Sequence, residues 1–123
     1  MKSILIVEDQ PDIRKLIRMT LEFEPYDVHE ASDGVSGFRV AGEVKPDLML
    51  LDVMMPGELD GLQVCKKIKT DPELKNIRVI LLTARGQARD LDAGREAGAD
   101  EYLVKPFSPL QLIETIEKLL AEA

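Results

Sequence analysis

The chain is poor in cysteine, in aromatic residues and in long apolar runs. Its 123 residues include one cysteine, Cys65, and only 4% are aromatic. A single cysteine excludes an intrachain disulfide and is typical of the reducing cytoplasm. We therefore expect a cytoplasmic protein in which Cys65 packs against the core. The apolar runs are too short for a membrane span or for the hydrophobic region of a signal peptide.

The chain also has fewer basic than acidic residues. Sixteen lysines and arginines stand against 23 aspartates and glutamates, so the formal net charge is −7 at pH 7. A surface of this sign repels the phosphates of nucleic acids and of anionic lipids. We expect no direct binding of nucleic acid or membrane by this chain, and a better match to a cation or to a basic partner surface.

The remaining composition is that of an ordinary globular domain. It is 45% hydrophobic and 32% charged, and a chain of this length can bury a core without disulfides or metal. We found no linker, repeat or low-complexity tract. Residues 1–123 are therefore interpreted as a single domain.

Short apolar segments alternate with segments of helical periodicity. Continuous apolar runs predict strands that are buried on both faces, and these runs are Ile4–Val7, Leu48–Leu51, Val79–Leu82 and Tyr102–Val104. The more mixed segment Tyr26–Ala31 predicts an edge strand. This alternation predicts an α/β fold: a (βα)5 doubly wound parallel five-stranded sheet with helices on both faces. Its expected strand order is the flavodoxin-like 2-1-3-4-5.

Apolar residues at helical spacing predict which side of each helix faces the sheet. The expected positions are Ile13, Leu16, Ile17, Thr20 and Leu21 in the first helix, Val35, Phe38 and Val44 in the second, Leu62, Val64, Cys65 and Ile68 in the third, and Leu110, Ile113, Ile116 and Leu120 in the fifth. The fourth helix is expected over residues 86–97, where Gly94 weakens it.

Polar residues follow four of the expected strands at the point where each strand ends. They are Glu8-Asp9, Asp52, Thr83 and Lys105-Pro106. Ligands of an open parallel sheet bind outside the carboxyl ends of its strands. We therefore expect these side chains to converge on one mouth, although they are far apart in the sequence.

Three carboxylates in one place raise each other's pKa unless positive charge offsets them. Lys105 is one possible source of this positive charge. A hard divalent cation, Mg²⁺ (or Mn²⁺), is another, because such ions bind carboxylate, carbonyl and water oxygens. A carboxylate can also act as a covalent nucleophile towards phosphorus. Asp52 follows the expected central strand, and Thr83 offers a hydroxyl to a phosphoryl oxygen. The chain lacks a GxxxxGK[ST] loop, so a nucleotide bound by this domain is not the expected donor.

Five segments combine these residues: VEDQ (7–10), LLDVMMPG (50–57), DG (60–61), LLTA (81–84) and GADEYLVKPF (98–107). In this order and spacing, over the whole chain, they closely resemble the response-regulator receiver family of two-component systems, of the chemotaxis-type single-domain kind. The resemblance implies a phosphoacceptor that assists its own phosphorylation and dephosphorylation and is not an enzyme in the ordinary sense. It also implies a histidine kinase or phosphotransfer protein as donor, and an unknown downstream protein or output domain as target.

The resemblance further implies a role for each residue. Asp52 accepts the phosphoryl group, and Thr83 and Lys105 bind its oxygens. The metal ligands are Asp9, Asp52, the backbone carbonyl of Met54, and Glu8 through water. Thr83 and Tyr102 form the switch, which alters the surface of the fourth helix, fifth strand and fifth helix. The Lys105-Pro106 bond is expected to be cis.

Two features depart from the commoner family pattern. The loop Gly57-Glu58-Leu59 is one residue longer, which weakens any detailed interpretation of it as a docking surface. Met54 and Arg85 stand two residues after Asp52 and Thr83, where the family adjusts the lifetime of the phosphoryl group. A bulky and a cationic side chain there predict slow self-dephosphorylation.

Three alternative functions fit these residues less well. A flavodoxin would need phosphate donors in the loop after the first strand, where this chain has acidic residues. A phosphatase with an aspartate nucleophile would have a second acid two residues after Asp52, where Met54 stands. A degenerate, binding-only receiver would usually have lost Asp52, Lys105 or the acidic pair, and none is lost.

Overall fold

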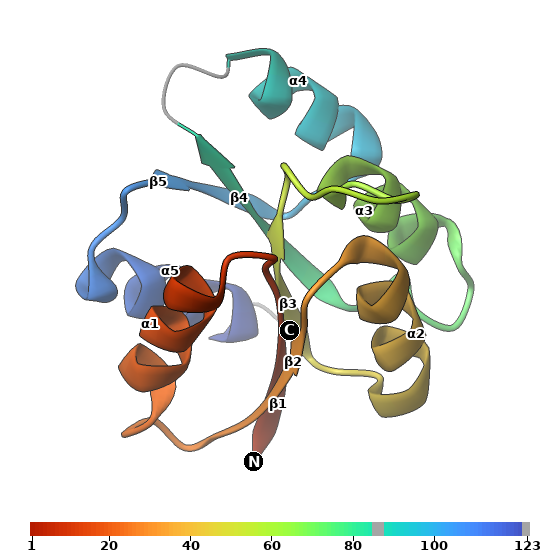
Figure 1. Cartoon of the computed structure of the whole chain (residues 1–123). Helices are drawn as coiled ribbons and strands as arrows, with labels where there is room; N and C mark the ends of the chain where they lie inside the picture. Colours follow the sequence, from red (N-terminus) through yellow and green to blue (C-terminus); the bar gives the residue numbers. More distant parts are fainter. Residues whose placement is uncertain (85–87, 122–123) are drawn as a thin grey trace.

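The computed structural model describes residues 1–84 and 88–121. Within these residues, five strands alternate with five helices (Figure 1). Their bounds are β1 Lys2–Val7, α1 Pro11–Leu21, β2 Tyr26–Ala31, α2 Gly34–Val44, β3 Leu48–Asp52, α3 Gly61–Thr70, β4 Arg78–Ala84, α4 Ala88–Ala97, β5 Glu101–Lys105 and α5 Pro109–Ala121. Every expected strand and helix is present; residues 86 and 87 of the expected fourth helix lie outside the described part of the chain.

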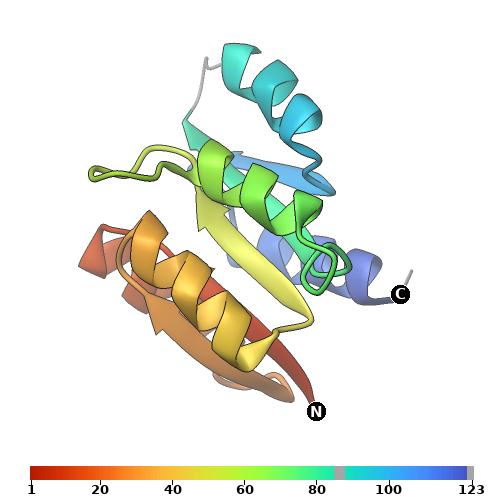
Figure 2. The same cartoon turned by 90° about the vertical axis from the view of Figure 1, so that its right-hand side faces the viewer.

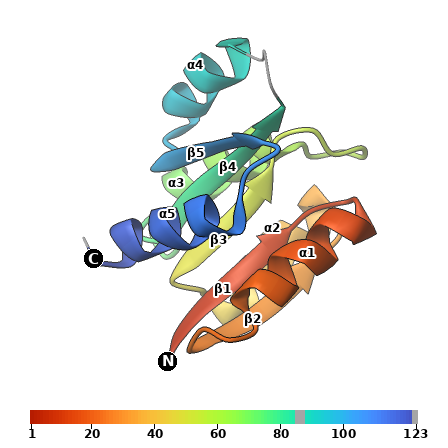
Figure 3. The ribbon, with the colours of Figure 1, turned by 90° about the vertical axis from the view of Figure 1, so that its left-hand side faces the viewer.

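All neighbouring strands of the sheet are parallel, and their order is β2-β1-β3-β4-β5. Helices α1 and α5 cover one face (Figure 3), and α2, α3 and α4 cover the other (Figure 2). Two apolar cores result, one on each face of the sheet. The central strand β3 is buried along its whole length, which is why its sequence is a continuous apolar run. The predicted fold is confirmed. The expected burial of Tyr102–Val104 on both faces is wrong, because β5 lies at the edge of the sheet and Val104 is exposed.

Local sequence determines where several helices begin. Asp33 caps α2, because its side chain accepts a hydrogen bond of 2.7 Å from the backbone N–H of Ser36. Asp60 and Gln63 form a reciprocal capping box at the start of α3. Both arrangements satisfy N–H groups that a helix start leaves without partners. The Lys105-Pro106 bond is cis, as expected.

The expected burial of three helix positions is wrong. The side chains of Leu16, Val35 and Leu110 are exposed, whereas Leu112 and Leu119 are buried in α5. Helix α2 approaches the sheet through small residues: a Cβ on Gly37 would lie 2.7 Å from the side chain of Val7. A helix packed this closely buries a narrow stripe, so a branched residue beside the stripe turns outward.

The prediction for Cys65 is confirmed. Cys65 belongs to α3, and its side chain is buried in the core between this helix and the sheet. Burial raises the pKa of the thiol to about 11. No described helix has both the length and the apolar character needed to cross a membrane.

Candidate functional site

Asp52 is the last residue of β3, and its side chain points into a crowded position. Only 3% of the residue is exposed. The first residue of α3, Gly61, lies against the Asp52 main chain, since a Cβ on Gly61 would stand 2.0 Å from the carbonyl oxygen of Asp52. A glycine is therefore required there by close approach. In the sequence, Asp60-Gly61 stands out as one of the five matching segments, and no local signal reveals its contact with the candidate nucleophile.

The acidic residues expected to converge do so. One oxygen from each of Glu8, Asp9 and Asp52 lies within 4.8 Å of the others. Glu8 is fully buried, whereas Asp9 is partly exposed. Glu8 lies just beyond β1 and Asp52 ends β3, and these two strands are adjacent in the sheet. The tertiary structure thus brings together residues that are more than 40 positions apart.

Lys105 reaches the same cluster from the end of β5. Its ammonium donates to Asp52 Oδ1 at 3.1 Å and to Glu8 Oε2 at 3.3 Å. The cluster thus contains three carboxylates, two of which pair with Lys105, and its net charge is negative. Such a set of oxygen donors fits a hard divalent cation.

The electrostatics of Asp52 are dominated by its burial. Burial, together with repulsion from Glu8, raises the pKa of the carboxyl from its ordinary 3.8 to about 7, although Lys105 acts in the opposite direction. A nucleophilic carboxylate must be ionised. A cation bound beside it would favour that ionised form, so the residues present fit Mg²⁺.

Thr83 and Met54 are close to Asp52 through the sheet register and through the chain, respectively. Thr83 is the penultimate residue of β4, is 1% exposed, and directly follows Leu82, the register partner of Asp52. The backbone N–H of Met54 donates to Asp52 Oδ1 at 3.3 Å, and the Met54 side chain is 66% exposed. Arg85, expected at the same mouth, lies outside the described residues.

Tyr102 packs inward rather than extending into solvent. A Cβ on Gly94 would lie 2.7 Å from its ring carbon Cε1 and 2.7 Å from Leu81 Cδ1. The Tyr102 hydroxyl is buried and has no hydrogen-bond partner among the described residues. From the sequence, Gly94 was interpreted as a weak point of α4. The structure shows that this glycine makes room for the aromatic ring.

The strand order, and the acidic, threonine and lysine side chains at the ends of the strands, together define a receiver-type domain. Comparison with known proteins supports this classification. The model of the response regulator receiver domain family matches residues 4–117. The chain belongs to this family.

Curated relatives include regulators of transcription. The DNA-binding dual master transcriptional regulator RpaA of Synechocystis sp. is 41% identical over 98% of this chain and 49% of its own length. The transcriptional regulatory protein ResD of Bacillus subtilis is 44% identical, again over 98% of this chain and 49% of its own length. The chain thus spans about half the length of these relatives.

Solved structures share the whole fold. The receiver domain of a signal transduction histidine kinase from Syntrophus aciditrophicus superposes with a TM-score of 0.92 at 35% identity, over 100% of this chain and 92% of that chain. The chemotaxis protein CheY4 of Vibrio cholerae gives a TM-score of 0.89 at 29% identity, over 97% of this chain and 98% of that chain.

Proposed function

We propose that the chain is a phosphoacceptor in which Asp52 takes a phosphoryl group from a histidine kinase, a phosphotransfer protein or a small phosphodonor. One observation carries the proposal: the nearly buried Asp52 lies 3.1 Å from the ammonium of Lys105 at the edge of an acidic cluster. A structural carboxylate would not need two further acids beside it. Residues 1–123 act as one receiver unit in this proposal, in the cytoplasm.

The residues divide the chemistry between them. The carboxylate of Asp52 attacks phosphorus, and the bond from phosphorus to the nitrogen or oxygen of the donor breaks. Lys105 and the hydroxyl of Thr83 then hold phosphoryl oxygens. Asp9, Asp52 and the carbonyl of Met54 would hold Mg²⁺, with Glu8 acting through water. When bound, the ion supplies positive charge against the developing negative charge.

Phosphorylation is proposed to act as a switch by favouring one of two conformations. Thr83 would move to the phosphoryl group, and Tyr102 would settle further into the vacated space. The surface of α4, β5 and α5 would then change for a downstream protein or output domain. With a net charge of −7, this domain is not proposed to contact nucleic acid or membrane itself. DNA binding belongs to the longer relative RpaA by its name.

Intact-mass spectrometry after incubation with acetyl phosphate and Mg²⁺ tests the function. We expect one phosphoryl adduct, absent from the Asp52→Ala variant and absent when EDTA removes the cation. Its absence from the unaltered chain, under conditions in which another receiver reacts, would favour the binding-only alternative.

A further inference from the structure

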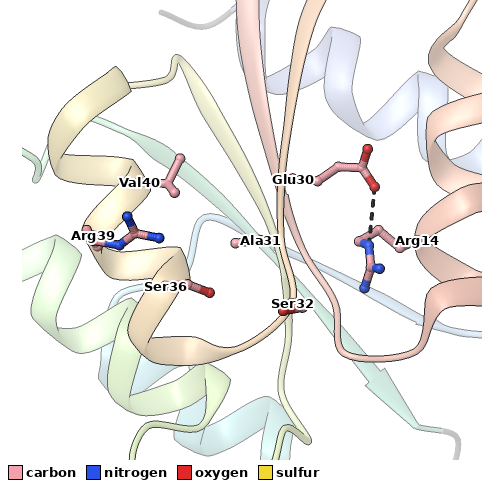
Figure 4. Close-up of a pocket in the computed structure, with 7 residues that line it drawn as sticks. All are labelled: Arg14, Glu30, Ala31, Ser32, Ser36, Arg39 and Val40. Atoms are coloured by element: carbon pink, nitrogen blue, oxygen red, sulfur yellow. Dashed lines mark ion pairs between the residues drawn. The ribbon is translucent and has the colours of Figure 1, made fainter.

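A cavity of about 430 Å³ lies beside the carboxyl end of β2. Two arginines line it, Arg14 from α1 and Arg39 from α2, and they face it from opposite sides (Figure 4). Their partners differ. Arg39 pairs at 3.6 Å with Glu43, one turn along the same helix, where both side chains are exposed. Arg14 is largely buried and contacts two other parts of the chain.

Arg14 joins β2 to the loop that carries the acidic pair. Its Nε lies 3.2 Å from Oε1 of Glu30, and its terminal nitrogen donates a 2.8 Å hydrogen bond to the backbone carbonyl of Glu8. The other oxygen of Glu30 pairs with Arg18. The guanidinium group of Arg14 is planar, so its contact with Glu30 also fixes the direction of the terminal N–H groups.

The carbonyl that accepts this hydrogen bond from Arg14 belongs to the peptide unit between Glu8 and Asp9, the two acidic residues after β1. Glu8 lies just beyond β1, and its N–H donates to the carbonyl of Ala31 at 3.2 Å. The carbonyl of Glu8 and the N–H of Asp9 are part of one rigid plane. A hydrogen bond that orients this carbonyl therefore also determines the direction in which the chain enters Asp9.

We propose that Arg14, held by Glu30, is a positioning residue for the acidic pair, and keeps Asp9 where it can share a divalent cation with Asp52. This inference rests on the proposed function. Arg14 itself contacts neither the cation nor the phosphoryl group. Partners of metal ligands commonly affect metal affinity about 10- to 100-fold, although they do not touch the metal.

Charge alone predicts the opposite result. Arg14 is positive and lies near the acidic cluster, so its charge repels Mg²⁺. A variant without this charge should bind Mg²⁺ more tightly if only long-range electrostatics mattered. Weaker binding would show that the hydrogen bond to the Glu8 carbonyl is the stronger effect.

The test compares Arg14→Met with Arg39→Met. Both variants remove a guanidinium from the same cavity and keep an unbranched stem, but only Arg14 reaches the loop. Isothermal titration calorimetry measures Mg²⁺ affinity directly, and phosphorylation by acetyl phosphate is followed over a range of Mg²⁺ concentrations. We expect affinity to fall about tenfold or more in Arg14→Met, with the rate restored at saturating Mg²⁺, and no weakening in Arg39→Met.

Equal or tighter Mg²⁺ binding in Arg14→Met, relative to Arg39→Met, would overturn the inference. If Arg14→Met does not fold by circular dichroism, Glu30→Leu replaces it, since that change removes the acceptor that orients the guanidinium but leaves Arg14 in place. Undiminished Mg²⁺ affinity in Glu30→Leu would then overturn the inference. The unaltered protein separates the two proposals: if it gains no Mg²⁺-dependent adduct on Asp52, the proposed function fails, and this inference with it.

Discussion

The ammonium of Lys105 lies 3.1 Å from Oδ1 of Asp52, across 53 positions of sequence. The same ammonium lies 3.3 Å from Oε2 of Glu8. One lysine thus serves two carboxylates, of which Glu8 is fully buried and Asp52 almost so. Burial, followed by repulsion from Glu8, raises the pKa of Asp52 to about 7 despite the cation in direct contact.

Replacing Lys105 by methionine should raise the pKa of Asp52 further, because Lys105 is the neighbour that lowers it. Carbon NMR of the Asp52 carboxyl, recorded without Mg²⁺, measures the change. Phosphorylation from acetyl phosphate should fall at least about tenfold, since a preorganised charge on the transferred group is lost. Lys66→Met, on the exposed side of α3, is the matched control and should change neither property. A pKa that stays at about 7 in Lys105→Met would contradict the prediction.

Stability without Mg²⁺ should fall as the pH rises from about 4 to about 7. The pKa of Asp52 is raised in the folded state, so the folded protein binds more protons than the unfolded chain in this window. Asp52→Asn removes the effect. At about pH 8, where Asp52 is ionised, this substitution should increase the free energy of unfolding by roughly 2 kcal/mol. This is about half of what the pKa shift alone would give, because the substitution also removes an ionic partner of Lys105.

Urea unfolding of Asp52→Asn and of the unaltered protein, at several pH values with EDTA, measures this difference. The two free energies should converge as the pH falls towards 4. A difference that is constant over the whole range would show that burial does not raise the pKa of Asp52.

Gly61→Ala should damage both stability and phosphorylation. The new Cβ would stand 2.0 Å from the Asp52 carbonyl oxygen and 2.8 Å from Val53 Cα, which are main-chain atoms that cannot rotate away. We expect a loss of about 1–3 kcal/mol in the free energy of unfolding, as for overpacking in a core. Gly42→Ala is the control, because nothing lies within 4 Å of its Cβ; it should stabilise α2 slightly. Equal effects of the two substitutions would refute the steric argument.

Gly94→Ala should move Tyr102 outward. The added Cβ meets only the ends of two side chains, Tyr102 and Leu81, within 3 Å, so the fold can persist while the ring is displaced. The chain has two tyrosines and no tryptophan, which allows Tyr102 to be followed by fluorescence in a Tyr26→Phe background. Acrylamide should quench Tyr102 more strongly in the Gly94→Ala variant. Unchanged quenching would show that Gly94 does not control the position of the ring.

Met54→Ala should shorten the lifetime of phosphorylated Asp52. The Met54 side chain is 66% exposed beside the site, where it can hinder an attacking water molecule. The rate at which the adduct disappears, followed by intact mass after removal of the phosphodonor, measures the lifetime. The same direction is predicted for Arg85→Ala, whose position lies outside the described residues. A longer lifetime in either variant would contradict the prediction.

Sequence patterns were sufficient for the fold and for the convergence of acidic residues and a lysine at one edge of the sheet. The run Leu48–Leu51 predicted a strand that is buried on both faces, because all four residues are apolar, and β3 is buried along its whole length. Strand ends of a parallel sheet meet at one edge, so the convergence of Glu8, Asp52 and Lys105 followed from topology. Helix faces were less well predicted: Leu110 is exposed, because the buried stripe of α5 runs through Leu112, Ile116 and Leu119. At 3.6 residues per turn, Leu110 lies about 200° around the helix from Leu112.

The sequence by itself thus determined the order of strands and helices and the residues at the mouth, because hydrophobic periodicity and strand-end chemistry are local properties. Only the tertiary structure revealed the contacts of Gly61, Gly94 and Arg14. Each of these contacts is with a distant backbone or ring: the Asp52 carbonyl, the Tyr102 side chain and the Glu8 carbonyl. Such contacts leave no periodic signal, since they arise only when separate elements pack within a few ångströms of one another.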